Sequence, residues 1–373
     1  MKTVGIICEY NPFHNGHLYH LNKVKEMFPN HTVILVMSTT FTQHGDPSMI
    51  NKWDKTKLAL ELGIDLVIEL PFGFTTQSAD VFAKGAIQIL HYLQVDNLVF
   101  GSELNNIETL SNLADITLTD KYQITVKKYV NDGINYPSAL SKALKDFSQI
   151  KIDQPNDILG ICYLKEIKKL NSNLKPFTIK RTNDYHSNEL NNPLSSATSI
   201  RLGLFNNQDI QKYVPSQTLK VLKPIFIEDY FPYLKYKILS EDNLTKYLDV
   251  DEGIENRIKK YIIDSTSIDE LINNIKSKRY TYSKLKRMLI HILCDFTKKE
   301  AKSYNQIKYI RVLGFNQNGR KYLNGIKKNL TIPIITKYNN LLDLELKITK
   351  IYSLGLNQPN LIKDEYQNKP IIK

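Results

Sequence analysis

Cysteine and long apolar runs are scarce in this 373-residue sequence, and both shortages narrow the class of protein. The three cysteines, Cys8, Cys162 and Cys294, lie far apart and form no C-x-x-C pair, which fits buried thiols in a reducing cytoplasm. There is no run of about 18 apolar residues and no basic-then-apolar leader, so we expect no membrane span and no export signal. Internal repeats and low-complexity tails are also missing. We therefore predict a cytoplasmic location.

The composition is that of an ordinary globular protein, but its charge is uneven. Apolar residues make up 42% and charged residues 24%, and the length predicts two or three domains. The net charge is +12, and residues 275–328 hold 15 Lys or Arg against two acids, leaving 35 bases and 36 acids elsewhere. A basic part attached to a neutral one suggests a polyanionic partner. The alternative is a Lys-rich composition that simply places Lys on solvated faces.

The first 27 residues predict a strand, a polar turn and a helix. Residues 4–8 form an apolar run short enough for a buried strand, and Asn11-Pro12 and Asn15-Gly16 are turn signals. Apolar residues then recur at near-helical spacing, which predicts a helix from about Asn15. The helix N-terminus would present unpaired backbone N–H groups to an anion.

Two histidines on this turn, His14 and His17, form an H-x-G-H pattern with Gly16. The pattern resembles that of nucleotidyltransferases, enzymes in which the α-phosphate of ATP is attacked. Imidazoles at this position can donate hydrogen bonds to phosphate oxygens as charge develops there. One alternative is that both histidines only cap the helix. A metal site with His20 is a weaker alternative, because no cysteine or carboxylate completes a ligand set.

The N-terminal half alternates strands with helices, which predicts a parallel sheet with right-handed crossovers. The predicted strands cover residues 4–8, 32–37, 65–70 and 97–100, and the helices between them cover residues 51–62 and 78–93. Ligands in such sheets bind outside the carboxyl ends of the strands. We therefore expect the H-x-G-H turn and Gly101-Ser102-Glu103 to converge. The long polar loop 38–50, with Gln43, His44 and Asp46, ends at the same rim; it would cover the nucleotide or a second substrate, unless it is a solvated connection.

Further along, the sequence predicts mostly helix over 107–147 with a break at 133–137, a helix over 155–169, and a strand over 177–180 with Arg181 at its end. The segment 195–201 has small hydroxyl residues ahead of Ile-Arg. It suits a helix N-terminus at which Ser199 and Arg201 hold phosphate oxygens, although Ser and Thr also cap helices in general.

The C-terminal part is predicted to be mainly helical and basic. Residues 252–276 are expected to be helical, residues 280–293 to form a basic amphipathic helix, and residues 310–315 and 332–336 to be strands around a short helix. Candidate phosphate contacts are Lys276, Lys278, Arg279, Lys284, Lys286 and Arg287. Tyr280 and Tyr282 could stack on bases, or be structural. The proposed organisation is an ATP-binding catalytic domain over 1–215 and a mainly helical, basic region over 216–373.

Several strings, in order along nearly the whole chain, resemble the bacterial tRNA(Met) cytidine acetate ligases. The most specific string is ICEYNPFHNGHLYH, at residues 7–20. The other matches are NKW at 51–53, DLVIELP at 65–71, FGSE at 100–103, PN at 155–156, ILG at 158–160, YLK at 163–165, KR at 180–181, TSIR at 198–201 and KRYT at 278–281.

The resemblance implies an α/β fold with a Rossmann-like parallel sheet of the nucleotidyltransferase type. It also implies that ATP and acetate form acetyl-adenylate and pyrophosphate, and that the acetyl group passes to N4 of the wobble cytidine (C34) of elongator tRNA(Met). His14 and His17 would be catalytic, and region 216–373 would bind the tRNA through Lys278, Arg279, Lys284, Lys286 and Arg287. By the resemblance and the phosphate-site pattern together, ATP would be bound by Ile7, Cys8, Glu9, Tyr10, Asn11, Pro12, Phe13, His14, Asn15, Gly16, His17, Leu18, Tyr19, His20, Gly101, Asn156, Arg181, Ser199 and Arg201. Mg²⁺ is expected to accompany ATP, with no protein ligand set for a metal.

The chain departs from the family pattern in the loop after the second strand. The usual Arg-Gly-Glu-Pro is His44-Gly45-Asp46-Pro47 here, and Asp157 stands where a second Asn is common. These changes leave the H-x-G-H turn untouched. The alternative function is a small-molecule adenylyltransferase that releases pyrophosphate, which would explain H-x-G-H but no separate basic part. The sequence leaves open how acetate is held, which group takes the cytidine proton, how the tRNA is distinguished, and the oligomeric state.

Overall fold

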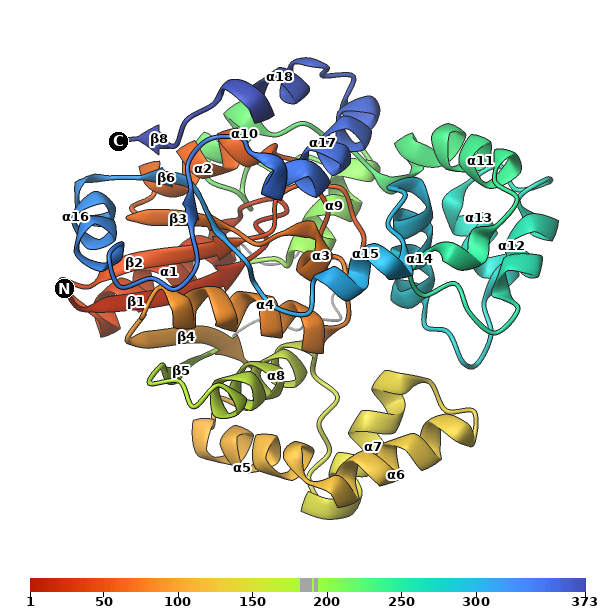
Figure 1. The fold of residues 1–373 in the computed structure, drawn as a ribbon, viewed down its shortest axis with the longest axis horizontal. Coiled ribbons are helices and arrows are strands. Elements are labelled where there is room, and N and C mark those ends of the chain that lie inside the picture. The colour runs from red at the N-terminus through yellow and green to blue at the C-terminus, as the bar shows by residue number, and fades with distance from the viewer. Residues whose placement is uncertain (182–189, 191–193) are drawn as a thin grey trace.

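The computed structural model describes residues 1–181, 190 and 194–373, and it is built around one mixed β-sheet (Figure 1). The strands are β1 (Thr3–Cys8), β2 (Thr32–Met37), β3 (Leu66–Glu69), β4 (Asn97–Ser102), β5 (Lys175–Lys180), β6 (Ile310–Phe315), β7 (Ile334–Ile335) and β8 (Ile371–Ile372). They lie in the order β5-β4-β1-β2-β3-β6-β7, with β8 also paired to β6. Strands β1 to β5 are parallel, which confirms the predicted fold class, whereas β6 runs antiparallel to β3.

Helices cover both faces of the sheet, because the buried strands direct alternate apolar side chains to opposite sides. In β2, Ile34 and Val36 belong to the core on one face, while Val33 and Leu35 belong to the core on the other. The first core is closed by α4 (Ala79–Tyr92) and α8 (Pro155–Lys169), and the second by α1 (Asn15–Met27) and α2 (Lys52–Glu61). These helices match the predicted ranges closely.

A helical arm follows β4 and lies below the sheet in Figure 1. It consists of α5 (Ile107–Leu118), α6 (Asp120–Asn131) and α7 (Tyr136–Ser148). The predicted break before α7 is confirmed. A second break lies at Thr119, whose extended backbone ends α5 and whose hydroxyl accepts a hydrogen bond from the Tyr122 N–H to begin α6.

A second group of helices, at the right of Figure 1, has its own apolar core. It contains α11 (Phe231–Ser240), α12 (Ile254–Tyr261), α13 (Ile268–Ile275), α14 (Tyr282–Leu293) and α15 (Lys298–Ser303), and it is reached through α9 (Ala197–Phe205) and α10 (Ser216–Val221). The stretch predicted to be helical over 252–276 contains two helices, α12 and α13, with an interruption between them. Polar residues 264–267 end the first helix, and the Ser267 hydroxyl caps the second by accepting from the Glu270 N–H.

The last part of the chain returns to the sheet. Strands β6 to β8 extend the sheet beyond β3. The helices of this part of the chain are α16 (Gln317–Ile326), α17 (Asp343–Leu356) and α18 (Asn360–Gln367). One sheet therefore takes strands from both sides of residue 215, and the division of the chain at that point stays a prediction. Within the described residues, no helix combines the length and apolar character needed to cross a bilayer.

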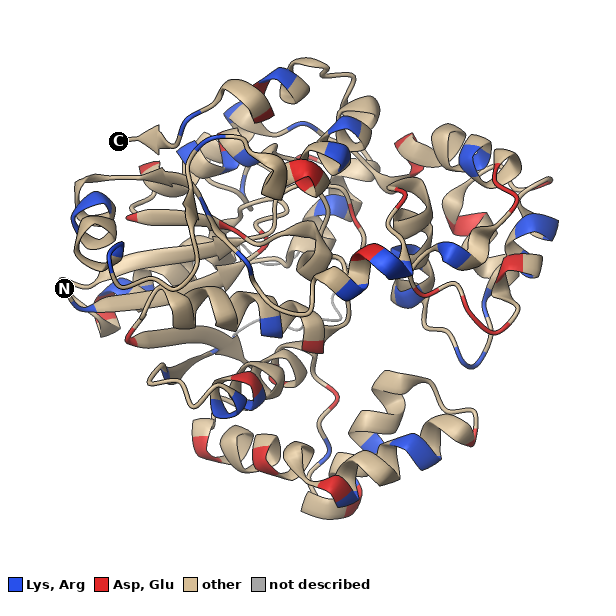
Figure 2. Ribbon diagram, in the orientation of Figure 1, with Lys and Arg blue, Asp and Glu red and all other residues tan. Residues whose placement is uncertain are grey.

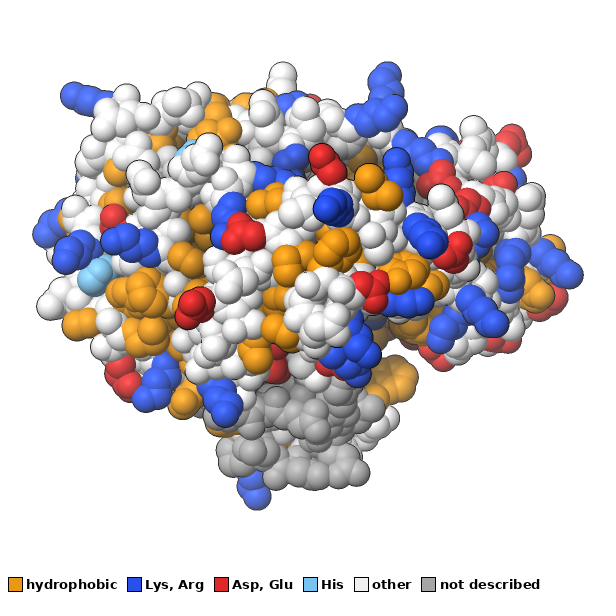
Figure 3. Space-filling model, turned by 90° about the horizontal axis from the view of Figure 1, so that it is seen from below, with side chains coloured by type: hydrophobic (Ala, Val, Ile, Leu, Met, Phe, Trp, Pro, Cys, Tyr) orange, Lys and Arg blue, Asp and Glu red, His pale blue; other side chains and the backbone are white. Residues whose placement is uncertain are grey.

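The basic run 275–328 is divided between distant parts of the molecule. Figure 2 shows the Lys and Arg of α14 and α15 within the helical group, and those of α16 at the opposite end of the sheet. On the face drawn in Figure 3, Lys and Arg side chains are spread among acidic and apolar ones. The run that looked like one basic module is thus two separate surfaces.

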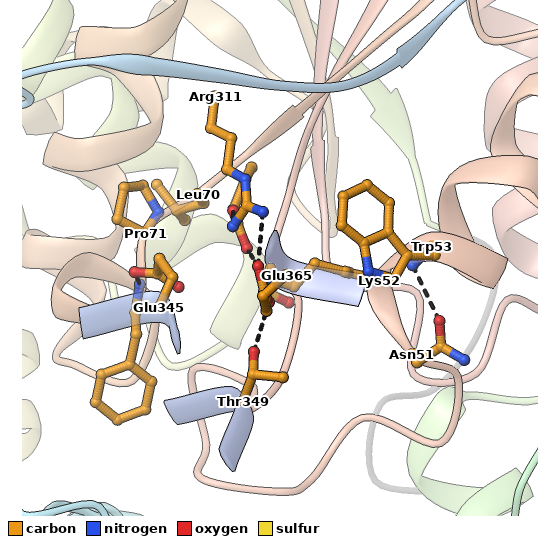
Figure 4. A network of polar contacts seen from close by, with 12 residues as sticks. Asn51, Lys52, Trp53, Leu70, Pro71, Arg311, Glu345, Thr349 and Glu365 are labelled. Atoms are coloured by element: carbon orange, nitrogen blue, oxygen red, sulfur yellow. Dashed lines mark hydrogen bonds and ion pairs between the residues drawn. The ribbon is translucent and has the colours of Figure 1, made fainter. Parts of the chain in front are cut away.

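A buried ion network joins the N-terminal and C-terminal contributions to the sheet (Figure 4). Lys52 lies 2.6 Å from both Glu69 and Glu365, and Arg311 lies 2.8 Å from Glu69 and 2.6 Å from Glu365. Glu345, close by, accepts the Phe72 N–H at 2.8 Å. Lys52 and Glu69 come from the NKW and DLVIELP strings, so this part of the resemblance reflects fold stability. Arg311 belongs to the basic run, but its guanidinium is paired within this buried network and adds nothing to a basic surface.

Candidate active site

In the turn between β1 and α1, each of the two motif histidines forms one hydrogen bond to the backbone through its Nδ1 atom. His14 is the N-cap of α1, and its Nδ1 accepts a hydrogen bond from the Gly16 N–H at 3.0 Å. His17 Nδ1 accepts one from the His14 N–H at 3.4 Å, and the two ring centroids are 3.8 Å apart. The histidines therefore do cap the helix, but only with Nδ1. An imidazole that accepts at Nδ1 carries its hydrogen at Nε2, so each ring keeps one N–H donor.

Both imidazoles are uncharged at neutral pH. Burial, assisted by the positive charges of Arg181 and Arg201, lowers the pKa of His14 to about 3. Burial and the neighbouring His14 ring lower the pKa of His17 well below its ordinary value. Two neutral N–H donors beside two permanent cations are suited to an anion that spreads charge over several oxygens, as a phosphate does.

Gly16 is required by this arrangement. A Cβ at position 16 would stand 2.8 Å from His14 Cε1 and 2.9 Å from His14 Nδ1, closer than side chains tolerate. A larger residue would therefore push the His14 ring out of its cap. The glycine of H-x-G-H permits the ring to fold back onto the first turn of α1.

A second cluster forms where β4 and β5 end and α8 begins, and it lines the same cleft as the H-x-G-H turn, which confirms the predicted convergence at this rim. Arg181 lies 3.6 Å from the Glu103 carboxylate, and its Nη1 donates to Asn156 Oδ1 at 3.5 Å. Asn156 in turn donates to Glu103 at 2.6 Å. The side chain of Arg181 crosses Gly101, where a Cβ would stand 3.2 Å from its Cγ. Arg181 Nε is buried without a hydrogen-bond partner among the described residues, so this guanidinium retains a donor.

Asp157, which replaces the second Asn of the family pattern, shapes the loop after β4. Its carboxylate accepts from the Ser102 hydroxyl at 2.5 Å and from the N–H groups of Glu103 at 3.1 Å and Leu104 at 3.1 Å. Asp157 is buried and satisfied by these donors. The substitution is therefore compatible with the position of Glu103 beside Arg181.

Helix α9 begins at the predicted segment, and its arginine reaches back to the first turn. Ser196 is the N-cap, accepting the Ser199 N–H at 3.1 Å. Arg201 Nη1 donates to the Asn11 carbonyl at 2.8 Å, and Nη2 lies 3.6 Å from Asp46. The H-x-G-H turn and the segment 195–201, which were both predicted to bind phosphate and lie far apart along the chain, thus form one surface.

The loop 38–50 is packed rather than solvated, so the solvated alternative is wrong. Phe41 and Met49 enter the core of the helical group, while His44 and Asp46 line the cleft. Burial, partly opposed by Asp46, lowers the pKa of His44 to about 4, so this residue is neutral where the family pattern has a cation.

Asp46 connects three elements. Burial alone would raise the pKa of Asp46, but Lys286 at 2.6 Å and Arg201 outweigh it and hold the value at about 2. The carboxylate therefore links the loop to α14 and to α9. Sequence reasoning missed this link, because Lys286 is 240 residues away and the basic run made it look like a free surface cation.

Basic residues of α14 and of the turn before it form the far wall of the cleft. Arg279, Lys284 and Arg287 line it, and Arg287 Nε has no hydrogen-bond partner among the described residues. Lys278 is exposed outside the cleft. Tyr280 is buried and donates to the Asp251 carbonyl at 3.0 Å, which makes it structural.

The two walls enclose a cleft of about 1190 Å³. Its lining includes, of the predicted ATP-binding residues, Ile7, Cys8, Glu9, Tyr10, Asn11, His14, Gly16, His17, Tyr19, His20, Gly101, Asn156, Arg181 and Arg201. The lining does not include the remaining predicted residues, Pro12, Phe13, Asn15, Leu18 and Ser199; Phe13, for example, is fully buried against Tyr10 and His17. Among the described residues, no group of three or more His, Cys, Asp or Glu side chains is placed to hold a metal ion.

Fold and site together define an α/β nucleotidyltransferase with an H-x-G-H phosphate site. The family model described as HIGH Nucleotidyl Transferase matches residues 1–368. A tRNA(Met) cytidine acetate ligase of Geobacillus sp. is 39% identical, and one of Clostridium kluyveri 41%; both alignments cover all of this chain and 99% or more of the relative. The chain belongs to the tRNA(Met) cytidine acetate ligase family.

Solved structures agree with this assignment. Thermotoga maritima TmcAL in its apo form has a TM-score of 0.93 at 30% identity, covering 100% of this chain and 99% of that one. TmcAL bound with alpha-thio ATP has a TM-score of 0.89 at the same identity and coverage.

Proposed function

We propose that this protein is an ATP-dependent ligase that forms acetyl-adenylate from acetate and ATP and then acetylates N4 of the wobble cytidine of elongator tRNA(Met). The observation that carries the proposal is the cleft itself. Its first wall holds neutral N–H donors and arginines suited to a phosphate, and its second wall holds cations suited to a polyanion. The names of the relatives, and the ATP analogue bound to TmcAL, point to the same chemistry.

In the first step, an acetate oxygen attacks the α-phosphorus and pyrophosphate leaves. His14 and His17 would donate through Nε2 to phosphate oxygens, and Arg181 would supply the charge that the neutral rings lack. The permanent charge of such a guanidinium stabilises the pentavalent centre more than the ground state, because negative charge builds up on the oxygens there. Mg²⁺ would enter with ATP as part of the substrate.

In the second step, the cytidine amine attacks the acetyl carbon, and AMP leaves. Holding both reactants in one cleft replaces an encounter in solution by an intramolecular reaction, which can supply a large share of the rate. The exposed cations Lys278 and Arg279 would position the tRNA backbone without reading its sequence. The cleft cations Lys284 and Arg287 would face phosphates close to the target base.

The alternative is an adenylyltransferase for a small molecule, which the first wall alone would also fit. The two functions are separated by incubating the protein with ATP, labelled acetate and bulk bacterial tRNA that lacks the modification, followed by nucleoside analysis. Label in N4-acetylcytidine that depends on ATP and needs no acetyl-CoA supports the ligase. Failure of transfer, with adenylation of another small molecule, supports the alternative.

A further inference from the structure

The cleft contains one carboxylate at the H-x-G-H turn that the phosphate chemistry does not use. Glu9 directly follows β1, is partly buried, and lines the cleft together with His14 and His17. A carboxylate would repel the phosphates of ATP, so its placement among phosphate-binding groups calls for a role in another step. The transfer step needs such a group, because the cytidine amine must lose a proton as it becomes an amide.

The other acids of the cleft lining are engaged elsewhere. Asp46 is paired with Lys286 and Arg201, and Asp80 is paired with Lys165. Asp249 lies 3.5 Å from His291 of α14. Within the described residues, the Glu9 carboxylate forms no ion pair, and its Oε1 accepts only the Gln43 N–H, at 2.7 Å. One carboxylate oxygen is thus fixed by the loop, and the group is oriented without being neutralised.

The other basic side chains near the turn are weaker candidates for accepting the proton. Burial lowers the pKa values of His20 and His44 to about 4, so neither ring is a stronger base than the Glu9 carboxylate, whose pKa is raised. His14 and His17 use Nδ1 in the helix cap and carry a hydrogen on Nε2. Lys55 is fully buried, does not line the cleft, and its Nζ donates to the Glu9 carbonyl at 2.9 Å and the Ser38 carbonyl at 3.1 Å. Lys55 therefore holds the ends of β1 and β2 in place beneath the carboxylate.

The charged surroundings of Glu9 favour a proton acceptor. Burial raises the pKa of its carboxyl, while the Gln43 hydrogen bond, Lys55 and Arg201 oppose the rise and Asp46 supports it. The titratable groups of Cys8 and Tyr163 also face it, and burial keeps both protonated by raising their pKa values. A carboxylate whose pKa is raised is more basic than an ordinary glutamate, and it is therefore a better base for an attacking amine.

We propose that Glu9 is the general base of acetyl transfer. As the N4 nitrogen forms its bond to the acetyl carbon, the bond from that carbon to the phosphate oxygen breaks and its electron pair leaves with AMP. One N4 proton passes to the Glu9 carboxylate and from there to water in the open cleft. The products are N4-acetylcytidine, AMP and one proton. This assignment rests on the proposed function and extends it to a step that the sequence left open.

The test separates the two half-reactions in Glu9→Gln. Glutamine keeps the size of the side chain and can still accept the Gln43 N–H, so folding should be retained, which a thermal melt verifies. We expect acetate-dependent ATP–pyrophosphate exchange to stay close to wild type, while single-turnover transfer to tRNA at pH 7 falls by about 100-fold or more. The wild-type transfer rate should fall at acid pH as Glu9 gains a proton, and E9Q should lack that acid limb.

Glu166→Gln is the matched control, because Glu166 is a buried glutamate that does not line the cleft. It should leave both half-reactions unchanged. Wild-type transfer by E9Q, or an equal loss of exchange and transfer, would overturn the inference. Should E9Q fail to fold, E9D replaces it, and retention of the acid limb at a reduced transfer rate is then the expected result. If the wild-type protein forms no N4-acetylcytidine, the proposed function itself fails, which is a distinct outcome.

Discussion

Each histidine of the H-x-G-H turn combines a structural task with a chemical one. Nδ1 satisfies a backbone N–H of the first turn, and the hydrogen on Nε2 is left for a ligand. Because the cap fixes the tautomer, the donor needs no proton uptake from solution. This explains how rings with strongly lowered pKa values can still bind an anion.

Replacing His14 or His17 by alanine should lower adenylate formation by about 10²–10³-fold, because one donor to the developing charge is removed. Removal of the cap should also reduce the free energy of unfolding by about 1 kcal/mol. Pyrophosphate exchange and thermal melting measure the two effects. tRNA binding should remain nearly intact. His31→Ala, on the surface turn after α1, is the control and should change neither quantity. Wild-type exchange in H14A and H17A would refute the assignment.

Gly16→Ala tests the position of a ring rather than its presence. The added Cβ would displace His14, and a shift of about 1 Å at a reacting centre can cost about 100-fold in rate. Pyrophosphate exchange should therefore drop steeply, while the melting temperature should fall no further than in H14A, in which the same cap is lost. Gly325→Ala is the matched control, because a Cβ there meets nothing within 4 Å. Equal exchange activity of G16A and G325A would contradict the steric argument.

At the scale of elements, the cleft is assembled by contacts between segments that are remote in sequence. Asp46 ties the loop after β2 to α9 and α14, and Arg201 ties α9 to the first turn. The loop consequently acts as a structural wall as well as a lining. Its polar sequence conceals this, because Phe41 and Met49 are the apolar residues that anchor it.

Asp46→Asn should make the stability of the protein less dependent on acid pH. The pKa of Asp46 is lowered from 3.8 to about 2 in the folded protein, so its stabilisation is present above about pH 4 and is lost as the pH falls through 2. Wild type should exceed D46N by about 2 kcal/mol at pH 6 and by much less at pH 2. Chemical denaturation across this range measures the difference, with the exposed Asp115→Asn as control. A pH-independent difference would exclude the ion pairs as its source.

The turn before α14 should contribute to tRNA affinity, whereas α16 should not. Reversing the exposed charges in Lys278→Glu/Arg279→Glu should weaken binding and reduce the salt slope by roughly one for each phosphate that is no longer neutralised. Lys321→Glu/Lys328→Glu changes the same charge at the other end of the basic run, at the opposite end of the sheet, and should leave affinity unchanged. Filter binding at several salt concentrations measures the tRNA affinity and the salt slope of both double variants. Lys286 is a poor probe, because its reversal would break the largely buried Asp46 pair, whereas the Arg279–Glu252 pair is exposed and contributes little to stability.

At the scale of the whole molecule, a buried ion network joins chain segments separated by more than 200 residues. Lys52 and Arg311 each bridge Glu69 and Glu365, and burial with the nearby Glu69 charge raises the pKa of Glu345 to about 8. Glu345 is therefore largely protonated at neutral pH, which limits the negative charge of the network. The C-terminal strands and helices are thus bound to the sheet electrostatically as well as by packing (Figure 4).

Arg311→Met should lower the free energy of unfolding by about 3–5 kcal/mol, because it leaves two buried carboxylates incompletely paired. Urea denaturation provides the measurement. The exposed Arg320→Met removes the same charge from the neighbouring α16 and should change stability by less than about 0.5 kcal/mol. Equal stability of R311M and wild type would show that the network contributes specificity of folding rather than stability.

Much of the fold and part of the candidate site follow from local sequence patterns. The apolar runs of β1 to β4 are buried on both faces, and the helices between them have clear periodicity, so both signals are strong. The H-x-G-H turn and the Ser196 cap of α9 are equally local, because a cap is decided by a few consecutive residues. The convergence of β1 and β4 at one rim follows from the parallel topology.

Only the tertiary structure decided which charged side chains form ion pairs and which remote segments come into contact. Lys286 and Arg311 belong to one basic run in the sequence, yet each forms ion pairs with carboxylates more than 50 residues away. Contacts between remote segments also decide three other features. These are the antiparallel direction of β6, the division of the basic run, and the absence of an ion pair at Glu9 among the described residues. Ion pairing and sheet closure depend on distances between remote segments, and a linear sequence specifies those distances only through the folded chain.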